Sequence, residues 1–204
     1  MLIIGLTGSI GMGKSTAAHR FRERGIAVFD ADAAVHALYQ GPLAAEIGAA
    51  FPGTVVDGKV DRAKLSAALV KTPGLFKKLE AIVHPRVKAS EREFVRAEAK
   101  RGARMVVLEI PLLIESETHE RVDAVVVVSA SAEVQRARVL ARPGMSAEKF
   151  AEILKRQRPD WEKRVLADFV VDTNGSVETC TVQVDDIIGK LEHRAGHAFA
   201  HFWA

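Results

Sequence analysis

The sequence is short of the features that stabilise secreted and membrane proteins. Its 204 residues include one cysteine, Cys180, which can form no internal disulfide and has no partner cysteines for a metal site. Residues 1–6 are apolar but lack a basic leader and are far fewer than a signal-peptide core needs, and the run at 124–128 has the length of a strand. We therefore expect a structural role for Cys180, a cytoplasmic location and no membrane partner.

A strong excess of one charge is also lacking. The chain has 29 Lys and Arg residues against 26 Asp and Glu residues, a formal net charge of +3, which is too small to indicate a nucleic-acid-binding protein. We therefore expect no nucleic-acid partner. The proportions of hydrophobic and charged residues, 48% and 27%, are typical of a globular chain, and the length predicts one domain, residues 1–204.

Short apolar runs alternate with segments of helical spacing along the chain. Such alternation predicts a doubly wound α/β fold with a parallel sheet that is covered on both faces. Helical spacing predicts helices at 14–24, 131–141 and 177–191, and a basic helical hairpin that begins at Ser146. The sheet is predicted to have five strands, at residues 2–7, 26–29, 105–110, 122–128 and 169–172.

A mostly helical insert, residues 33–104, is predicted between the second and third strands. We place His84-Pro85 at the start of a long helix, because the residue before a proline disfavours the helical conformation. The other dipeptides in the insert that are typical of turns or helix boundaries are Gly41-Pro42, Pro52-Gly53, Asp57-Gly58 and Thr72-Pro73.

The most informative motif occupies residues 8–15, where Gly-Ser-Ile-Gly-Met-Gly-Lys-Ser matches G-x-x-x-x-G-K-[ST]. The motif lies between a predicted strand and a predicted helix, which is the context that a phosphate-binding loop requires. Glycines allow backbone N–H groups to close around phosphate oxygens, and the helix N-terminus adds a favourable partial positive charge. We therefore predict nucleotide contacts from Gly8, Ser9, Gly11, Met12, Gly13, Lys14, Ser15 and Thr16.

The side chains at the end of this loop predict the cofactors. Lys14 brings a positive charge to the β and γ phosphates, so we expect it to be catalytic. Ser15 offers a hydroxyl to Mg²⁺ as the metal ligand, and Thr16 is expected to contact the α-phosphate. The predicted cofactors are therefore ATP, as the phosphoryl donor, and Mg²⁺.

A phosphate loop occurs in kinases, GTPases and ATP-driven motors, so the rest of the chain must indicate the acceptor. The GTPase alternative lacks the guanine-reading segment Asn-Lys-x-Asp. A nucleic-acid-stimulated ATPase is favoured only by the modest basic excess. The short chain with a helical insert after the second strand favours a kinase that phosphorylates a hydroxyl of a small-molecule substrate.

Further segments, taken with the phosphate loop, resemble the dephospho-coenzyme A (dephospho-CoA) kinase family over residues 2–175. In that family ATP phosphorylates the ribose 3′-hydroxyl of dephospho-CoA, the last step of coenzyme A biosynthesis. The resemblance implies a sheet of the P-loop kinase type, a helical substrate-binding insert and a helical lid, here residues 138–168. Ser9, Met12 and Ile114 depart from the residues common in the family but spare the phosphate motif. The resemblance is carried by residues 7–16, Asp30-Ala31-Asp32, His84-Pro85, residues 111–115, Arg142, Gln157, Ala167-Asp168 and Asn174-Gly175.

Asp32 is the residue that the resemblance implies as the catalytic base. Its position agrees, because a carboxylate just beyond the carboxyl end of a parallel strand faces the crevice in which ligands bind. The alternative for Asp32 is a helix N-cap. Asp30 is either that cap or a partner that orients Asp32, and we favour the orienting role.

The resemblance also implies residues that contact dephospho-CoA. His84 and Pro85 match an acceptor-side motif, although a His before Pro is also an ordinary helix boundary. Pro111, Leu112 and Leu113 follow the third strand, where an apolar wall suits adenine or pantetheine. Core packing is the alternative for these three residues.

Two residues later in the chain are implied on the ATP side. Arg142 resembles a lid arginine that approaches the transferring phosphoryl group, and Arg138, one helical turn earlier, shares its face. The alternative for Arg142 is a solvated helix end. Asn174 resembles a residue that lies against the adenine of ATP, with a plain turn as the alternative. The roles of Glu109 and of residues 196–204 stay open.

Overall fold

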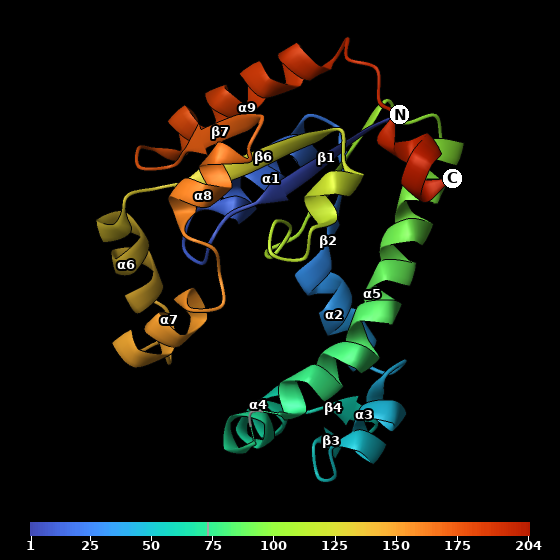
Figure 1. Ribbon diagram of the computed structural model, residues 1–204, viewed down its shortest axis with the longest axis vertical. Coiled ribbons are helices and arrows are strands. Elements are labelled where there is room, and N and C mark those ends of the chain that lie inside the picture. The colour runs from blue at the N-terminus through green and yellow to red at the C-terminus, as the bar shows by residue number, and fades with distance from the viewer. Residues whose placement is uncertain (73) are drawn as a thin grey trace. The chain divides into compact units, whose positions relative to one another are not determined.

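The computed structural model of the chain describes residues 1–72 and 74–204 and divides into two compact units (Figure 1). Unit 1 comprises Met1–Phe29 and Val95–Ala204, and unit 2 comprises Asp30–Phe94. The predicted insert, residues 33–104, begins and ends later in the chain than unit 2 does. The turn predicted at Thr72-Pro73 includes Pro73, which lies outside the described residues.

A five-stranded sheet forms the centre of unit 1, in the order β2-β5-β1-β6-β7. β1 pairs in parallel with β5 and with β6, and β6 pairs in parallel with β7. β1 and β6 are buried along their whole length, as strands covered on both faces must be. The predicted doubly wound parallel sheet is confirmed. Its strands are β1 (Leu2–Thr7), β2 (Ala27–Asp30), β5 (Met105–Glu109), β6 (Ala124–Ser129) and β7 (Phe169–Asp172).

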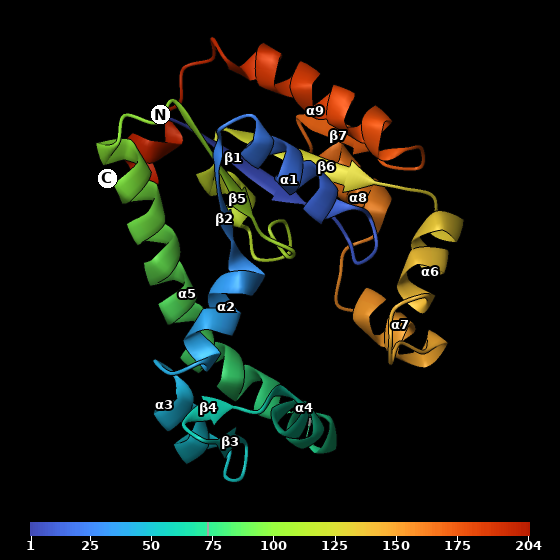
Figure 2. The same ribbon diagram turned by 180° about the vertical axis from the view of Figure 1, so that it is seen from behind.

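Helices cover both faces of this sheet. α1 (Lys14–Glu23) and α9 (Val177–Leu191) pack against each other and against the sheet, and Figure 2 shows α1 in front of the strands. α8 (Asp160–Val165) packs against β6 and lies in front of the strands in the opposite view (Figure 1). The shared core combines alternate apolar residues of β1 with buried residues of α1 and α9, and it includes Cys180, Leu2, Ile4, Leu6, Phe21 and Val184.

Two serines begin the pair of helices that follows β6. The Ser131 hydroxyl accepts a hydrogen bond from the Val134 N–H and starts α6 (Ala132–Leu140), as the sequence predicts. The Ser146 hydroxyl accepts one from the Lys149 N–H and starts α7 (Ala147–Leu154). α6 and α7 pack against each other. Among the described residues, no helix has both the length and the apolar character that a membrane span requires.

Unit 2 is helical except for one short hairpin. Its strands β3 (Val55–Val56) and β4 (Lys59–Val60) pair antiparallel through Asp57 and Gly58, which both have positive φ, 49° and 72°, as a type I′ turn requires. The hairpin was not predicted, because two-residue strands leave no alternating pattern. The helices are α2 (Ala31–Tyr39), α3 (Ala44–Ala50), α4 (Arg62–Lys71) and α5 (Leu75–Lys100), and they enclose a core that includes Leu43, Ile47, Phe51, Leu65 and Leu69.

The predicted helix boundary at His84-Pro85 is wrong. Pro85 lies inside α5, which begins at Leu75 and continues to Lys100. Proline has no N–H to donate to the carbonyl four residues earlier, so inside a helix it usually causes a kink or ends the helix. Here the helix continues through the proline, and Figure 1 shows α5 as one bent helix. Packing of its apolar residues Leu79, Val83 and Val87 into the core of unit 2 outweighs the lost hydrogen bond.

The C-terminal residues, whose role the sequence left open, pack onto unit 1. Trp203 lies in a short π-helix, Phe199–Trp203, and its side chain is only 1% exposed. Its indole Nε1–H donates to the carbonyl of Arg121, at the end of the 3-10 helix Thr118–Arg121, at 2.9 Å. The Arg96 guanidinium donates to the Trp203 carbonyl at 2.9 Å. The tail is therefore anchored to unit 1 by the buried Trp203 side chain, while its other residues are mostly exposed.

We expect Trp203→Ala to lower the free energy of unfolding by about 3 to 5 kcal/mol, because it removes a fully buried aromatic side chain and leaves a cavity. Phe202→Ala is the matched control, since Phe202 is its neighbour and is 39% exposed. The loss of unfolding free energy in Phe202→Ala should stay near 1 kcal/mol or less, about the size of its exposed cation–π contact with Arg121. Urea unfolding followed by fluorescence measures both, and equal losses would contradict the assigned packing.

Candidate active site

The phosphate loop, residues 8–15, has a backbone path that only glycine allows at three positions. A Cβ added at Gly8 would lie 2.3 Å from Cγ2 of Val128, in β6. Gly11 and Gly13 have φ of 79° and 83°, in the left-handed region that side chains disfavour. The glycines of the motif are therefore required by the fold of the loop as well as by phosphate.

Polar contacts from outside the loop hold its backbone in place. The N–H of Ile10 donates to Oε1 of Gln157 at 3.1 Å, and its carbonyl accepts from Nε2 of Gln135 at 2.8 Å. The hydroxyl of Thr173 donates to the carbonyl of Met12 at 2.9 Å. Sequence reasoning assigned no role to Gln135 or Thr173, because isolated polar residues on helices and after strands carry no motif. Only Gln157 stood within the family resemblance.

Ser9 and Met12 belong to the loop through their backbones rather than their side chains. Both residues are buried, and the Met12 sulfur accepts a hydrogen bond from the Ala130 N–H at 3.1 Å. The Met12 N–H donates to the Ser9 carbonyl at 3.1 Å. Neither side chain is therefore exposed on the outer surface of the loop.

Lys14 forms an ion pair with Glu109, the last residue of β5. The Lys14 ammonium lies 2.8 Å from Oε1 of Glu109, and the Arg22 guanidinium lies 3.4 Å from Oε2. Glu109 is 3% exposed, and a buried carboxylate needs such partners to offset its lost hydration. The open role of Glu109 is thus answered: it holds the lysine of the phosphate loop. Ser15 is exposed and Thr16 is half-buried at the start of α1.

The carboxyl ends of the parallel strands bring further residues to the same edge of the sheet. Asn174 follows β7, and its Oδ1 accepts from the N–H of Ser131, after β6, at 2.7 Å. Its Nδ2 donates to Oδ1 of Asp172 at 2.8 Å. Asn174 is therefore more than a plain turn, because it ties two loops together, and one amide hydrogen is left over.

Pro111 and Leu112 lie beside the start of the phosphate loop. The Thr7 hydroxyl donates to the Pro111 carbonyl at 3.1 Å, and Thr7 immediately precedes Gly8. Leu112 is 40% exposed. Leu113 is instead fully buried in a core cluster with Ile114 and cannot add its side chain to a binding surface, so core packing is the correct interpretation for it.

Arg138, in α6, and Arg142, just after its end, have different surroundings. The Arg138 guanidinium donates to the Thr173 carbonyl at 2.6 Å and to its hydroxyl at 3.2 Å. Arg138 is thereby fixed to the segment after β7. Arg142 is exposed, and its side chain has no hydrogen-bond or ion-pair partner within residues 1–72 and 74–204. Of the two, Arg142 is the one available to a ligand.

Asp30 and Asp32 of unit 2 have separate roles. The Asp30 carboxylate accepts a hydrogen bond from the Ala33 N–H at 2.9 Å and is the N-cap of α2. The favoured orienting role for Asp30 is therefore replaced by the capping role, because its side chain is engaged with the helix backbone. Asp32 is exposed in the first turn of α2 and is not the cap.

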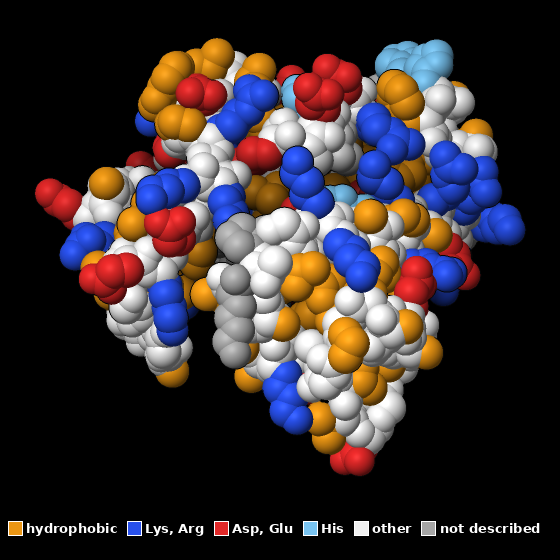
Figure 3. All heavy atoms as spheres, turned by 60° about the horizontal axis from the view of Figure 1, so that its bottom comes forward, with side chains coloured by type: hydrophobic (Ala, Val, Ile, Leu, Met, Phe, Trp, Pro, Cys, Tyr) orange, Lys and Arg blue, Asp and Glu red, His pale blue; other side chains and the backbone are white. Residues whose placement is uncertain are grey.

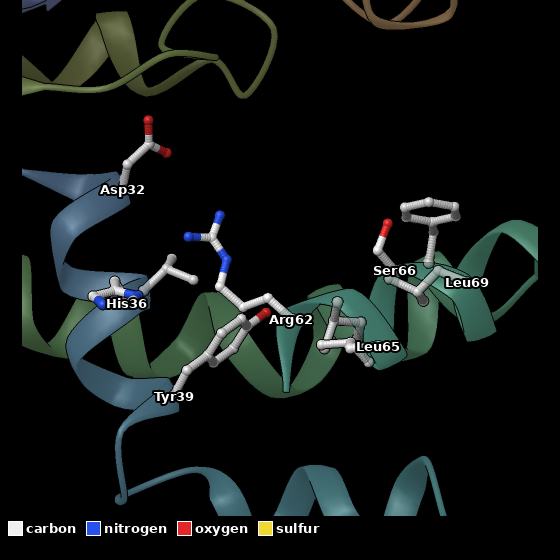
Figure 4. A pocket seen from close by; sticks show the side chains of 10 residues that line it. Asp32, His36, Tyr39, Arg62, Leu65, Ser66 and Leu69 are labelled. Atoms are coloured by element: carbon white, nitrogen blue, oxygen red, sulfur yellow. The ribbon is translucent and has the colours of Figure 1, made fainter. Parts of the chain in front are cut away.

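Asp32 lines a cavity of about 460 Å³ within unit 2, shown in Figure 4. Figure 4 shows the Asp32 and Arg62 side chains projecting into the open space, with Tyr39 below them. Burial raises the pKa of the Tyr39 phenol, which therefore stays neutral in the physiological range. The other side chains that line the cavity are those of Val35, His36, Leu65, Ser66, Leu69, Phe76 and Leu79.

His84 and Pro85 do not line this cavity. Both are exposed on α5 and are absent from the described residues that surround the cavity. The structure thus places Asp32 in a ligand-sized hollow and leaves the predicted acceptor contacts of His84 and Pro85 without such support. Tyr39 and Arg62 were not predicted, because a lone Tyr and an Arg after a helix cap are common on helices of any protein.

Comparison with known proteins identifies the family. The dephospho-CoA kinase family model matches residues 2–179. The chain is 54% identical over 196 residues to the dephospho-CoA kinase of Mesorhizobium japonicum, and the match covers 96% of this chain and 100% of that protein. It is 53% identical over 188 residues to the dephospho-CoA kinase of Rhodopseudomonas palustris, which covers 92% of this chain and 94% of that protein.

Solved structures agree. The crystal structure of TT1252 from Thermus thermophilus superposes with a TM-score of 0.78 at 37% identity and covers 93% of this chain and 97% of that one. Dephospho-CoA kinase from Campylobacter jejuni superposes with a TM-score of 0.70 at 25% identity, and the match covers 93% of this chain and 96% of that one. By its family-model match and its relatives, and in agreement with its phosphate loop and sheet order, the chain belongs to the dephospho-CoA kinase family.

Proposed function

We propose that this chain phosphorylates dephospho-CoA through Lys14, Asp32 and Arg142. The family's reaction transfers the γ-phosphoryl group of ATP to dephospho-CoA, the last step of coenzyme A biosynthesis, and the hydroxyl that is phosphorylated is the ribose 3′-hydroxyl. The observation that carries the assignment is the phosphate loop, in which Gly8, Gly11 and Gly13 leave no place for a side chain, with Lys14 at its end held by the buried carboxylate of Glu109. A cytoplasmic location is part of the proposal, since a single buried cysteine suits a reducing compartment.

The phosphate loop would bind ATP through its backbone N–H groups and Lys14. Transferring phosphoryl groups spread charge over their oxygens, so catalysis depends mostly on positioning and electrostatic stabilisation. Lys14 would leave Glu109 for the β and γ phosphates, and Arg22 would remain as the partner of Glu109. Asn174 would meet the adenine with its remaining amide hydrogen.

The residues at the loop fit Mg²⁺. Among the described residues no cluster of three or more His, Cys, Asp or Glu side chains forms a metal cage. Mg²⁺ does not need one, because it keeps several waters and binds through few protein ligands together with substrate phosphates. Ser15 would hold it by its exposed hydroxyl, and the metal would supply charge neutralisation to the phosphates when bound.

Asp32 would accept the proton of the 3′-hydroxyl as it attacks. Its carboxylate is free of the capping role, which belongs to Asp30, and it lines a cavity of a size that suits a ligand. Pro111 and Leu112 would offer apolar contacts to the acceptor, and contacts from His84 and Pro85 stay predictions. Arg142 would add charge to the transferring group from the proposed lid, residues 138–168, whose closure would exclude water.

One assay tests the reaction. The pure chain is incubated with ATP, Mg²⁺ and separate acceptors, including dephospho-CoA, adenosine, gluconate and shikimate, and the products are identified by mass. Phosphorylation of dephospho-CoA is expected, it should stop when EDTA removes the metal, and added DNA or RNA should leave it unchanged. Indifference to nucleic acid is expected because the formal net charge is only +3, and the face shown in Figure 3 carries acidic and apolar side chains as well as Lys and Arg. Conversion of a different acceptor alone would overturn the substrate.

Lys14→Ala should lower turnover by about a hundredfold or more, because it removes a fixed charge from the transferring group. The variant should stay folded, since Glu109 keeps Arg22 as a partner. Lys190→Ala is the control: Lys190 is exposed in α9, pairs with Asp186, and should have normal activity. Near-normal turnover in folded Lys14→Ala would remove Lys14 from the mechanism.

Asp32→Asn should lower the turnover number by about 10² to 10⁴, the usual range for a lost general base, and should spare the KM for ATP. The amide keeps the size of the side chain but cannot accept the proton. Asp30→Asn is the matched control, since Asn caps a helix as well as Asp does. Steady-state kinetics and thermal melts compare the two, and a turnover number of Asp32→Asn within about threefold of wild type would exclude the base role.

A further inference from the structure

We propose that Arg62 binds the diphosphate of dephospho-CoA inside the unit 2 cavity and thereby selects acceptors that carry this charged group. The inference rests on the proposed function, because it takes the Asp32 cavity to be the acceptor site. It adds a second anchor to that site: Asp32 meets the reacting hydroxyl, and Arg62 meets the phosphates attached to the same ribose.

Arg62 is a cation without an ion-pair partner among the residues that the structure describes. Its side chain leaves the first residue of α4 and extends into the cavity, at the level between Asp32 and Tyr39 (Figure 4). Within the part of the chain that the structure describes, its guanidinium makes no hydrogen bond or ion pair. An arginine that projects into a cavity and is left unpaired there is available to an anionic ligand.

The neighbouring carboxylate does not neutralise Arg62. Asp61 precedes it, and Oδ1 of Asp61 accepts hydrogen bonds from the N–H groups of Ala63 and Lys64, both at 3.0 Å. The other oxygen, Oδ2, lies 4.0 Å from the ammonium of Lys64. Asp61 therefore serves the helix start and Lys64, and the charge of Arg62 stays directed into the cavity.

The charge of Arg62 affects the pKa of another side chain that lines the cavity. Burial raises the pKa of the Tyr39 phenol, while the positive charge of Arg62 acts on the same group in the opposite direction. The other titratable side chains that line the cavity are Asp32 and His36. Arg62 is the one lining residue, within the described chain, that carries a positive charge at every physiological pH.

The chemistry of the acceptor calls for both of these groups, a carboxylate and a guanidinium, in one cavity. In dephospho-CoA one ribose carries both the reacting 3′-hydroxyl and, at its 5′ position, the diphosphate, so a site for the hydroxyl and a site for the phosphates must share one cavity. A guanidinium suits the second site, because its planar fork donates two parallel hydrogen bonds to phosphate oxygens. The half-buried apolar side chains of Val35, Phe76 and Leu79 would contact the uncharged pantetheine arm.

Arg62→Gln tests the assignment. With saturating ATP, the KM for dephospho-CoA should rise about tenfold to a hundredfold, the usual loss for a hydrogen bond to a charged group, while the KM for ATP stays within about twofold. Arg62→Lys should fall in between, because an ammonium keeps the charge but not the fork. Raising KCl from about 50 to 500 mM should increase the acceptor KM of the wild type more steeply than that of Arg62→Gln, since screening acts on the charge that the variant lacks.

Lys64→Gln is the matched control, because Lys64 is an exposed cation on the same helix and is not among the residues that line the cavity. Its acceptor KM and salt response should equal those of the wild type. An acceptor KM within about twofold of wild type in folded Arg62→Gln, or an equal rise in both KM values, would overturn the assignment. Failure of both Arg62 variants to fold would assign Arg62 a structural role and contradict it as well. A wild-type chain that leaves dephospho-CoA unmodified would instead overturn the proposed function.

Discussion

The first turn after β1 has no room for a side chain, because the backbone at Gly8 packs directly against Val128 of the neighbouring strand. This close approach fixes where the phosphate loop leaves the sheet. The left-handed conformations of Gly11 and Gly13 then turn the chain into α1, so that Lys14 and Ser15 begin the helix. Lys14 and Ser15, which we propose as the ligands of phosphate and Mg²⁺, take their positions from this turn.

Side chains from distant parts of the chain complete what the glycines begin. A loop that contains three glycines is flexible by itself, and contacts that satisfy its backbone groups stabilise one conformation. Thr173 and Gln135 supply two of these contacts, to the carbonyls of Met12 and Ile10. Since Thr173 also binds Arg138, the loop, the segment after β7 and α6 form one hydrogen-bonded network. The lid that we propose therefore extends from a base that is anchored to the phosphate loop.

The sequence predicted the sheet and the phosphate loop because both depend on local patterns: continuous apolar runs and a glycine motif between strand and helix. It failed where the outcome depends on packing between distant residues. Nothing local indicates that α5 continues through Pro85, that Asp30 rather than Asp32 caps α2, or that Leu113 is core while Leu112 is exposed. Arg62 was missed for the same reason, because only the fold of unit 2 brings it to the cavity of Asp32.

The ion pair between Lys14 and Glu109 has a consequence for selectivity among anions. A bare ammonium at the start of a helix would attract chloride, sulfate and inorganic phosphate. Glu109 pairs with both Lys14 and Arg22, so an anion must compete with a buried carboxylate for the lysine. Weakly charged ions gain little from that exchange, whereas a triphosphate brings enough charge, and enough backbone contacts along the loop, to displace the carboxylate. In the function that we propose, Glu109 would therefore compete with small ions for Lys14 until a nucleotide binds.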